Sequence, residues 1–304
     1  MPATSSGTSY TVYTSAGTGY GTAAYAVADA HKNDTDIPTI LYTHGAGGAY
    51  NQFATLAAWS GLRDWIIDHG GAWVEGSGGL TEAAGQGNWG NTGARAAYVA
   101  YLEWAATKID IGPVIPLGRS MGGVIAPWLY LRSPIASQCA GMIVSSGVQT
   151  LTYGTRDSVN GALKPTGQYF GQAILDAYGA ADYAEFVTKS ADFDPMNFMP
   201  SLWDGKKVLQ LVGTADATVP RAVRGADPLR AIYSGRLSDD RFDVREGGDH
   251  SQGNGTYLQV SAMTAFLTDI AFANVGPPKE PQSYRVLGHW LYQAGQRFAM
   301  TPTF

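Results

Sequence analysis

Short apolar runs alternate along this chain with longer segments whose apolar residues recur at helical spacing. The clearest short runs cover residues 38–43, 72–75, 113–117, 141–144 and 206–212. Weaker strand candidates cover residues 9–13, 23–28 and 242–245. Helical spacing is seen over residues 52–67, 91–109 and 256–273. Because strands alternate with helices, we predict an α/β fold with a mostly parallel central sheet and helices on both faces.

Segment 148–204 interrupts this alternation and is too long for an ordinary connection between two strands. It is rich in aromatic residues, among them Tyr169 and Phe170. An aromatic insertion above the strand ends predicts a lid or cap, in which we expect Tyr169 and Phe170 to contact a bulky or apolar substrate. A small helical subdomain with its own aromatic core is a second interpretation, compatible with the first.

The end of the chain forms a separate region in this prediction. Residues 276–281 read Gly-Pro-Pro-Lys-Glu-Pro, which favours a stiff linker, and residues 284–292 are unusually apolar for a terminus. This tail either packs back on the domain or docks on another chain, as in an oligomer or a larger assembly, and local packing is the favoured interpretation. We therefore divide the chain into a domain over residues 1–275, including the insertion, and a proline-linked extension over 276–304.

Composition restricts the partners and the compartment. Only 15% of the 304 residues are charged and the net charge is −5, which argues against a nucleic-acid partner. Cys139 is the only cysteine, which excludes an intrachain disulfide, and its apolar run predicts a buried thiol. Residues 1–16 show no secretory signal and no apolar stretch has the ~20 residues of a membrane span. The compartment stays open between the cytoplasm and export by a signal-independent route.

The candidate chemistry starts at Gly118-Arg119-Ser120-Met121-Gly122, which lies between an apolar run and a second apolar segment. A serine at a tight strand-to-helix corner adopts a strained backbone, so the residues two positions before and after it must be very small. Its hydroxyl then lies at a helix N-terminus, where backbone N–H groups favour negative charge. The spacing predicts that Ser120 is a nucleophile.

A nucleophilic serine requires a base, and a carboxylate that orients the base. Of the five histidines, His250 lies between the last predicted strand and the last helix, where a parallel sheet places functional side chains. Asp216 follows the 206–212 strand and is the best acid candidate by position. Asp249 is a weaker candidate because neighbouring side chains, such as those of Asp249 and His250, rarely face each other. Asp243 lies inside a predicted strand, and Asp227 lies further along the chain, before a proline.

The order Ser120, Asp216, His250 resembles the triad of the α/β-hydrolase superfamily, and the resemblance covers about residues 38–273. The Gly-x-Ser-x-Gly motif around Ser120 resembles the nucleophile elbow of that family. His-Gly-Ala-Gly-Gly at 44–48 resembles its oxyanion loop. The resemblance therefore implies an α/β-hydrolase fold and a serine esterase or lipase activity.

The same resemblance implies that the backbone N–H groups of Met121 and Ala46 bind the oxyanion, with Gly45 or Gly47 as substitutes for Ala46. The expected task of His44 is to hold this loop by hydrogen bonds.

Two further side chains are expected near the site. Arg119 either contacts an acidic group of the substrate or pairs with a carboxylate of the protein. The glycine-rich loop 76–90 should lie close by, and its Trp89 either stacks on substrate or packs internally.

No metal or cofactor is expected, because the chain has no His-Glu-x-x-His, Cys-x-x-Cys or Walker motif. These features predict a cofactor-free hydrolase that cleaves a carboxylic ester of a small molecule or a polymer. An amidase or peptidase of the same fold is one alternative. A non-catalytic binding module in a viral or cell-surface assembly is another.

Overall fold

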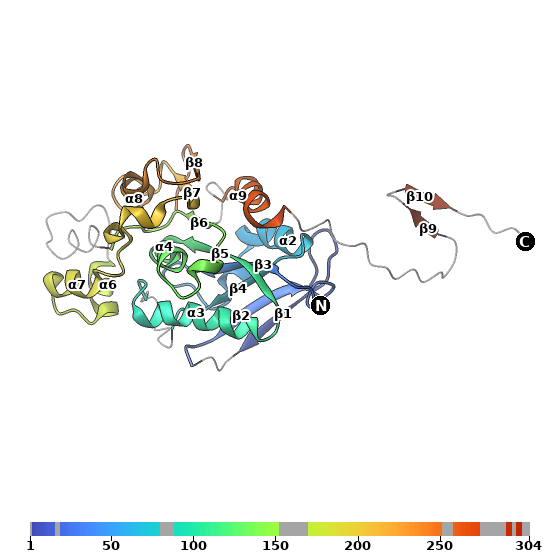
Figure 1. Ribbon diagram of the computed structural model, residues 1–304, viewed down its shortest axis with the longest axis horizontal. Coiled ribbons are helices and arrows are strands. Elements are labelled where there is room, and N and C mark those ends of the chain that lie inside the picture. Colours follow the sequence, from blue (N-terminus) through green and yellow to red (C-terminus); the bar gives the residue numbers. More distant parts are fainter. Residues whose placement is uncertain are drawn as a thin grey trace, which may run out of the picture.

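The computed structural model describes residues 2–15, 19–79, 88–151, 170–250, 258–273, 290–293 and 296–299. Its main sheet has eight strands in the order β1-β2-β4-β3-β5-β6-β7-β8 (Figure 1). The strands are β1 Tyr10–Ser15, β2 Ala23–Ala28, β3 Ile37–Thr43, β4 Ala72–Gly76, β5 Ile111–Arg119, β6 Met142–Ser145, β7 Lys207–Gly213 and β8 Asp239–Arg245. Strand β2 pairs antiparallel with β1 and β4, and all pairs from β4 to β8 are parallel. The predicted mostly parallel sheet is confirmed.

The helices among the described residues connect these strands. They are α1 Gln52–Thr55, α2 Ser60–Asp68, α3 Thr92–Ala106, α4 Ile125–Leu131, α6 Phe170–Tyr178, α7 Tyr183–Ser190, α8 Ala226–Tyr233 and α9 Val260–Leu267. Helix α9 continues into a π-helical turn over Thr268–Phe272. None of these helices combines the length and apolar composition needed to cross a bilayer.

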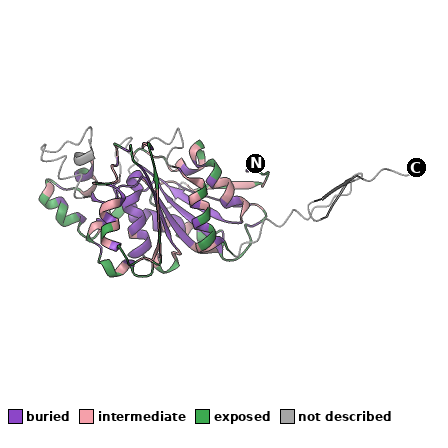
Figure 2. Cartoon of the chain, turned by 90° about the horizontal axis from the view of Figure 1, so that it is seen from above, coloured by how far each residue is buried: buried purple, intermediate pink, exposed green. Residues whose placement is uncertain are grey.

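Alternate residues of the strands supply cores on opposite faces of the sheet, because successive side chains of a strand point to opposite sides. Leu41 and Val74 pack with α3 and α4 on one face. Ile40 and Trp73 pack with α2 and α9 on the other. Strands β2, β3 and β4 are buried along their full length, and Figure 2 shows the sheet as a buried layer between partly exposed helices. This sandwich fixes the carboxyl ends of β3, β5 and β7 along one edge.

The continuous helix expected over residues 52–67 is wrong, because the chain breaks after α1. Leu56 is extended, with φ −73° and ψ 120°, and a short 3-10 turn over Ala57–Trp59 leads into α2. The Arg63 guanidinium donates to the Leu56 carbonyl oxygen at 2.9 Å and also to that of Phe53. These tertiary hydrogen bonds satisfy carbonyl groups that a continuous helix would have paired internally.

Between β6 and β7 the structure describes α6, α7 and two short 3-10 turns, Pro195–Asn197 and Pro200–Trp203. The rings of Tyr178 and Phe186 pack edge to face at 5.2 Å, and Trp203 packs on Tyr233 of α8 at 4.8 Å. The aromatic residues of this region therefore contribute to local cores. Its role as a lid over the site stays a prediction.

In the C-terminal extension the structure describes a hairpin of β9 Trp290–Gln293 and β10 Gln296–Ala299. The two strands pair antiparallel with each other, in a sheet separate from the main one. The predicted linker 276–281 lies outside the described residues. Packing of the extension on the domain, or docking on another chain, stays a prediction.

Candidate active site

The corner at Ser120 has the geometry expected from its glycines. Strand β5 ends at Arg119, Ser120 has φ +50°, and a 3-10 turn leads into α4. A Cβ placed on Gly118 would lie 2.6 Å from the Gly122 carbonyl oxygen, and one on Gly122 would lie 2.0 Å from the Thr43 carbonyl oxygen. Any side chain at either position would collide with backbone, so glycine is required on both sides of the serine.

The three predicted triad residues form one continuous hydrogen-bonded chain. Ser120 Oγ lies 2.9 Å from His250 Nε2, and His250 Nδ1 lies 2.8 Å from Asp216 Oδ2. The other oxygen of Asp216 accepts from the backbone N–H groups of Thr218 and Val219 at 3.0 and 2.7 Å. With only 5% of its surface exposed, Asp216 is held in one orientation towards the imidazole. The carboxyl ends of β5 and β7 and the loop after β8 thus meet at one point.

Two of the competing acids have other partners. Asp243 accepts from the Gln259 side chain at 2.6 Å, and Asp227 pairs with Arg221 at 3.3 Å. Two other histidines are also engaged away from Ser120, since His31 contacts Asp34 at 2.7 Å and His69 stacks on Trp65. His289 lies outside the described residues.

The loop after β3 packs against the serine. A Cβ on Gly45 would lie only 3.6 Å from Ser120 Oγ. The Gly45 carbonyl oxygen accepts from Gly48 N at 3.0 Å and lies 2.7 Å from His44 Nδ1. All described peptide bonds are trans, so a fixed Gly45 carbonyl directs the Ala46 N–H the opposite way. This arrangement controls the direction of the Ala46 donor.

His44 is buried, and each of its ring nitrogens lies within hydrogen-bond distance of a backbone carbonyl oxygen. Its Nε2 lies 2.9 Å from the Ser77 carbonyl oxygen, just beyond β4, while Nδ1 faces the Gly45 carbonyl. Carbonyl oxygens only accept, so both contacts are hydrogen bonds only when both ring nitrogens carry hydrogen. The ring thus lies between the loop after β3 and the end of β4, and the role of this loop in oxyanion binding stays a prediction.

Of the three residues predicted to contact substrate, only Trp89 has a side chain that the structure describes. The Trp89 side chain is only 2% exposed and packs in the α3 core, while the Trp89 backbone N–H donates to the Met121 sulfur at 3.4 Å. This burial favours internal packing of Trp89 over stacking on substrate. Tyr169 lies outside the described residues. Phe170 begins α6, and its side chain is outside them too.

Residues that the sequence interpretation missed support the site from behind. Thr43 Oγ1 donates to the Gly122 carbonyl oxygen at 3.0 Å, which links β3 to the serine corner. Glu75 is 1% exposed and accepts from the backbone N–H groups of Phe53 and Ala54 at 2.7 and 2.9 Å. Its carboxyl group thus caps the start of α1, where the Asn51 side chain makes no capping hydrogen bond. A charged residue that ends an apolar strand was the available signal for Glu75.

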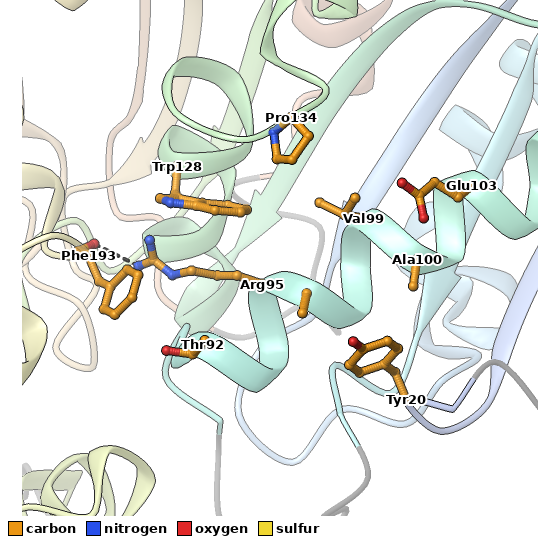
Figure 3. A pocket seen from close by; sticks show the side chains of 10 residues that line it. Tyr20, Thr92, Arg95, Val99, Ala100, Glu103, Trp128, Pro134 and Phe193 are labelled. Atoms are coloured by element: carbon orange, nitrogen blue, oxygen red, sulfur yellow. Dashed lines mark hydrogen bonds between the residues drawn. The ribbon is translucent and has the colours of Figure 1, made fainter.

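The start of α3 anchors the inserted region. Tyr178 O–H lies 3.1 Å from the Trp89 carbonyl oxygen, and Asn91 Nδ2 donates to the Ala177 carbonyl oxygen at 2.8 Å. Figure 3 shows the Arg95 guanidinium between Trp128 and Phe193, beside a groove of about 380 Å³. Burial lowers the pKa of Arg95 to about 10. Segment 88–91 thus contacts both the insertion and Met121, the residue that follows Ser120.

Within the described ranges, no group of three or more His, Cys, Asp or Glu side chains has the arrangement of a metal site. The side chain that contacts the Ser120 hydroxyl is the His250 imidazole. The chemistry that this arrangement can perform is proton transfer to and from the serine hydroxyl.

Comparison with known structures gives the fold its name. A prolyl endopeptidase aligns with 88% of this chain, with a TM-score of 0.62 and 16% sequence identity. An esterase of Pyrococcus furiosus aligns with 87% of it, with a TM-score of 0.58 and 12% identity. A truncated carbohydrate esterase from gut microbiota also aligns with 87%, with a TM-score of 0.61 and 16% identity. The chain spans 39% of the endopeptidase but 94% and 97% of the two esterases. No family model and no curated protein sequence matches. The chain has the α/β-hydrolase fold.

Proposed function

We propose that this protein is a serine hydrolase that cleaves a carboxylic ester through an acyl-enzyme intermediate. The observation that carries the proposal is the unbroken contact from Ser120 Oγ through His250 to Asp216, at 2.9 and 2.8 Å. This is the geometry that lets an imidazole take the proton of a serine hydroxyl. The two esterases that this chain matches over nearly their whole length support ester chemistry within the fold.

In the proposed reaction Ser120 Oγ attacks the ester carbonyl carbon while His250 Nε2 takes its proton. Asp216 stabilises the imidazolium and keeps Nδ1 protonated. The N–H groups of Met121 and Ala46 bind the oxygen that becomes negative, and loss of one such donor typically costs about 10²–10³-fold in kcat. His250 then protonates the leaving alcohol, and water repeats the sequence on the acyl-enzyme.

Cleavage of an amide or peptide bond is the second candidate, because a prolyl endopeptidase shares this fold. The same residues would act, with His250 protonating an amine instead of an alcohol. Paired ester and amide substrates with one acyl group distinguish the two candidates.

Substitution of the nucleophile tests the proposal. Ser120→Ala should retain the fold, lose labelling by a fluorophosphonate, and lose nearly all turnover of a chromogenic short-chain ester. Ser201→Ala changes an exposed serine and serves as the control. Wild-type activity in Ser120→Ala would refute the catalytic role, and absence of labelling in the wild type would favour the non-catalytic binding module.

A further inference from the structure

Arg119 places its charge beside the reaction centre. It ends β5, directly before the nucleophile, and its side chain is partly exposed. A Cβ placed on Gly45 would lie 2.7 Å from Arg119 Nη1 and 3.6 Å from Ser120 Oγ. These two distances place the guanidinium nitrogen and the hydroxyl oxygen at most about 6.3 Å apart. A substrate carbonyl at Ser120 lies within range of this charge.

Gly45 makes this placement possible. The same Cβ would also lie 3.0 Å from Ser120 Cβ, so a side chain at position 45 would displace the guanidinium or crowd the serine. The Gly45 carbonyl is held by Gly48 and His44, so the surface on which the guanidinium rests is fixed. The oxyanion loop thus forms a cradle for the end of Arg119, at the entrance to the proposed oxyanion site.

Arg95, another arginine in this part of the molecule, is buried. It is 1% exposed, lies between two aromatic rings, and donates to the carbonyl oxygens of Gly90 and Phe193 (Figure 3). Its contacts hold the inserted region on α3 and leave it inaccessible to a substrate at Ser120. Arg119 combines partial exposure with closeness to the nucleophile.

We propose that Arg119 binds an anionic group of the substrate, so that the enzyme prefers esters carrying a carboxylate near the scissile carbonyl. The inference rests on the proposed function. A guanidinium offers parallel N–H donors that match the two oxygens of a carboxylate. A charge-assisted hydrogen bond of this kind corresponds to roughly 10- to 100-fold in kcat/KM.

Matched ester pairs test the preference. For the alcohol part we compare meta-acetoxybenzoate with meta-acetoxybenzamide, which has nearly the same shape without the charge. For the acyl part we compare the monoethyl adipate anion with its primary amide. The readout is the ratio of kcat/KM for the charged and neutral members, because a general loss of activity cancels in that ratio.

We expect the wild type to favour the charged member of at least one pair by about tenfold or more. Arg119→Met should bring the ratio close to one, Arg119→Lys should retain part of it, and Arg119→Glu should invert it. Arg236→Met is the matched control, since Arg236 pairs with Asp204 before β7, at the opposite edge of the sheet. Added salt should reduce the wild-type preference.

A wild-type ratio of one or less in both pairs overturns the inference, as does a preference that Arg119→Met leaves intact. The Arg119→Lys and salt measurements keep the test decisive if Arg119→Met folds poorly. In either of these outcomes the enzyme still cleaves neutral esters and Ser120 is still labelled by the fluorophosphonate. Failure of the proposed function would instead abolish turnover of every ester and labelling of Ser120.

Discussion

Glu75 lets the pH dependence of stability be predicted from one buried carboxyl group. Burial raises its pKa from an ordinary 4.5 to about 8, against the opposing effects of the Phe53 and Ala54 amides and of Arg63. The folded protein therefore binds a proton that the unfolded chain releases between about pH 4.5 and pH 8. Stability should fall as pH rises through this window.

The magnitude follows from the same values. Each tenfold change in proton affinity is about 1.4 kcal/mol, so the rise from 4.5 to about 8 sets an upper limit of about 5 kcal/mol. Glu75→Gln keeps the shape and is neutral at every pH. It has one acceptor oxygen, so one of the two amides loses its partner, at a cost of about 1–3 kcal/mol that does not vary with pH.

The assay is urea unfolding of the wild type and Glu75→Gln, followed by far-UV circular dichroism, at about pH 4 and about pH 9 on either side of the window. We expect the wild type to lose several kcal/mol relative to the variant across this range. Glu103→Gln, at an exposed carboxyl of α3, should show a constant difference from the wild type. If the difference in free energy of unfolding between Glu75→Gln and the wild type is also the same at both pH values, the Phe53 and Ala54 amides outweigh burial and keep the Glu75 carboxylate ionised.

Two further substitutions test the site geometry. Gly122→Ala puts a methyl group where the Thr43 carbonyl oxygen lies at 2.0 Å, so we expect a loss of about 1–3 kcal/mol or more in urea unfolding, together with loss of esterase activity. Gly61→Ala in α2 meets its nearest side chain at 3.7 Å and should be neutral or stabilising; equal stability of both variants would contradict the packing described at Gly122. Asp216→Asn retains the acceptor for Thr218 and Val219 but presents an N–H to His250, so kcat should fall by about 10⁴ while the melting temperature changes little. Turnover near the wild-type rate would exclude Asp216 as the orienting acid.

The corner at Ser120 was predictable because its steric constraints are local. Glycines two residues from Ser120, between an apolar strand and a helix, satisfy a steric requirement that acts within a few positions of the chain. The choice of Asp216 and His250 followed from a general property of parallel sheets, whose carboxyl ends share one edge. Most strand positions were predictable for a similar reason, because buried strands leave short apolar runs.

Contacts between distant segments carry no comparable pattern. The support of α1 depends on Glu75 from β4, and Trp89 is buried in a core cluster that includes Met121 and residues of α3 and α4. Each of these outcomes was decided by what the folded sheet brings within a few ångströms. By itself, the sequence determined the strand-and-helix order and the sharp corner at Ser120, since these obey short-range sterics and periodicity. Only the tertiary structure decided which charged and aromatic side chains are buried, because their hydrogen-bond partners come from elsewhere in the chain.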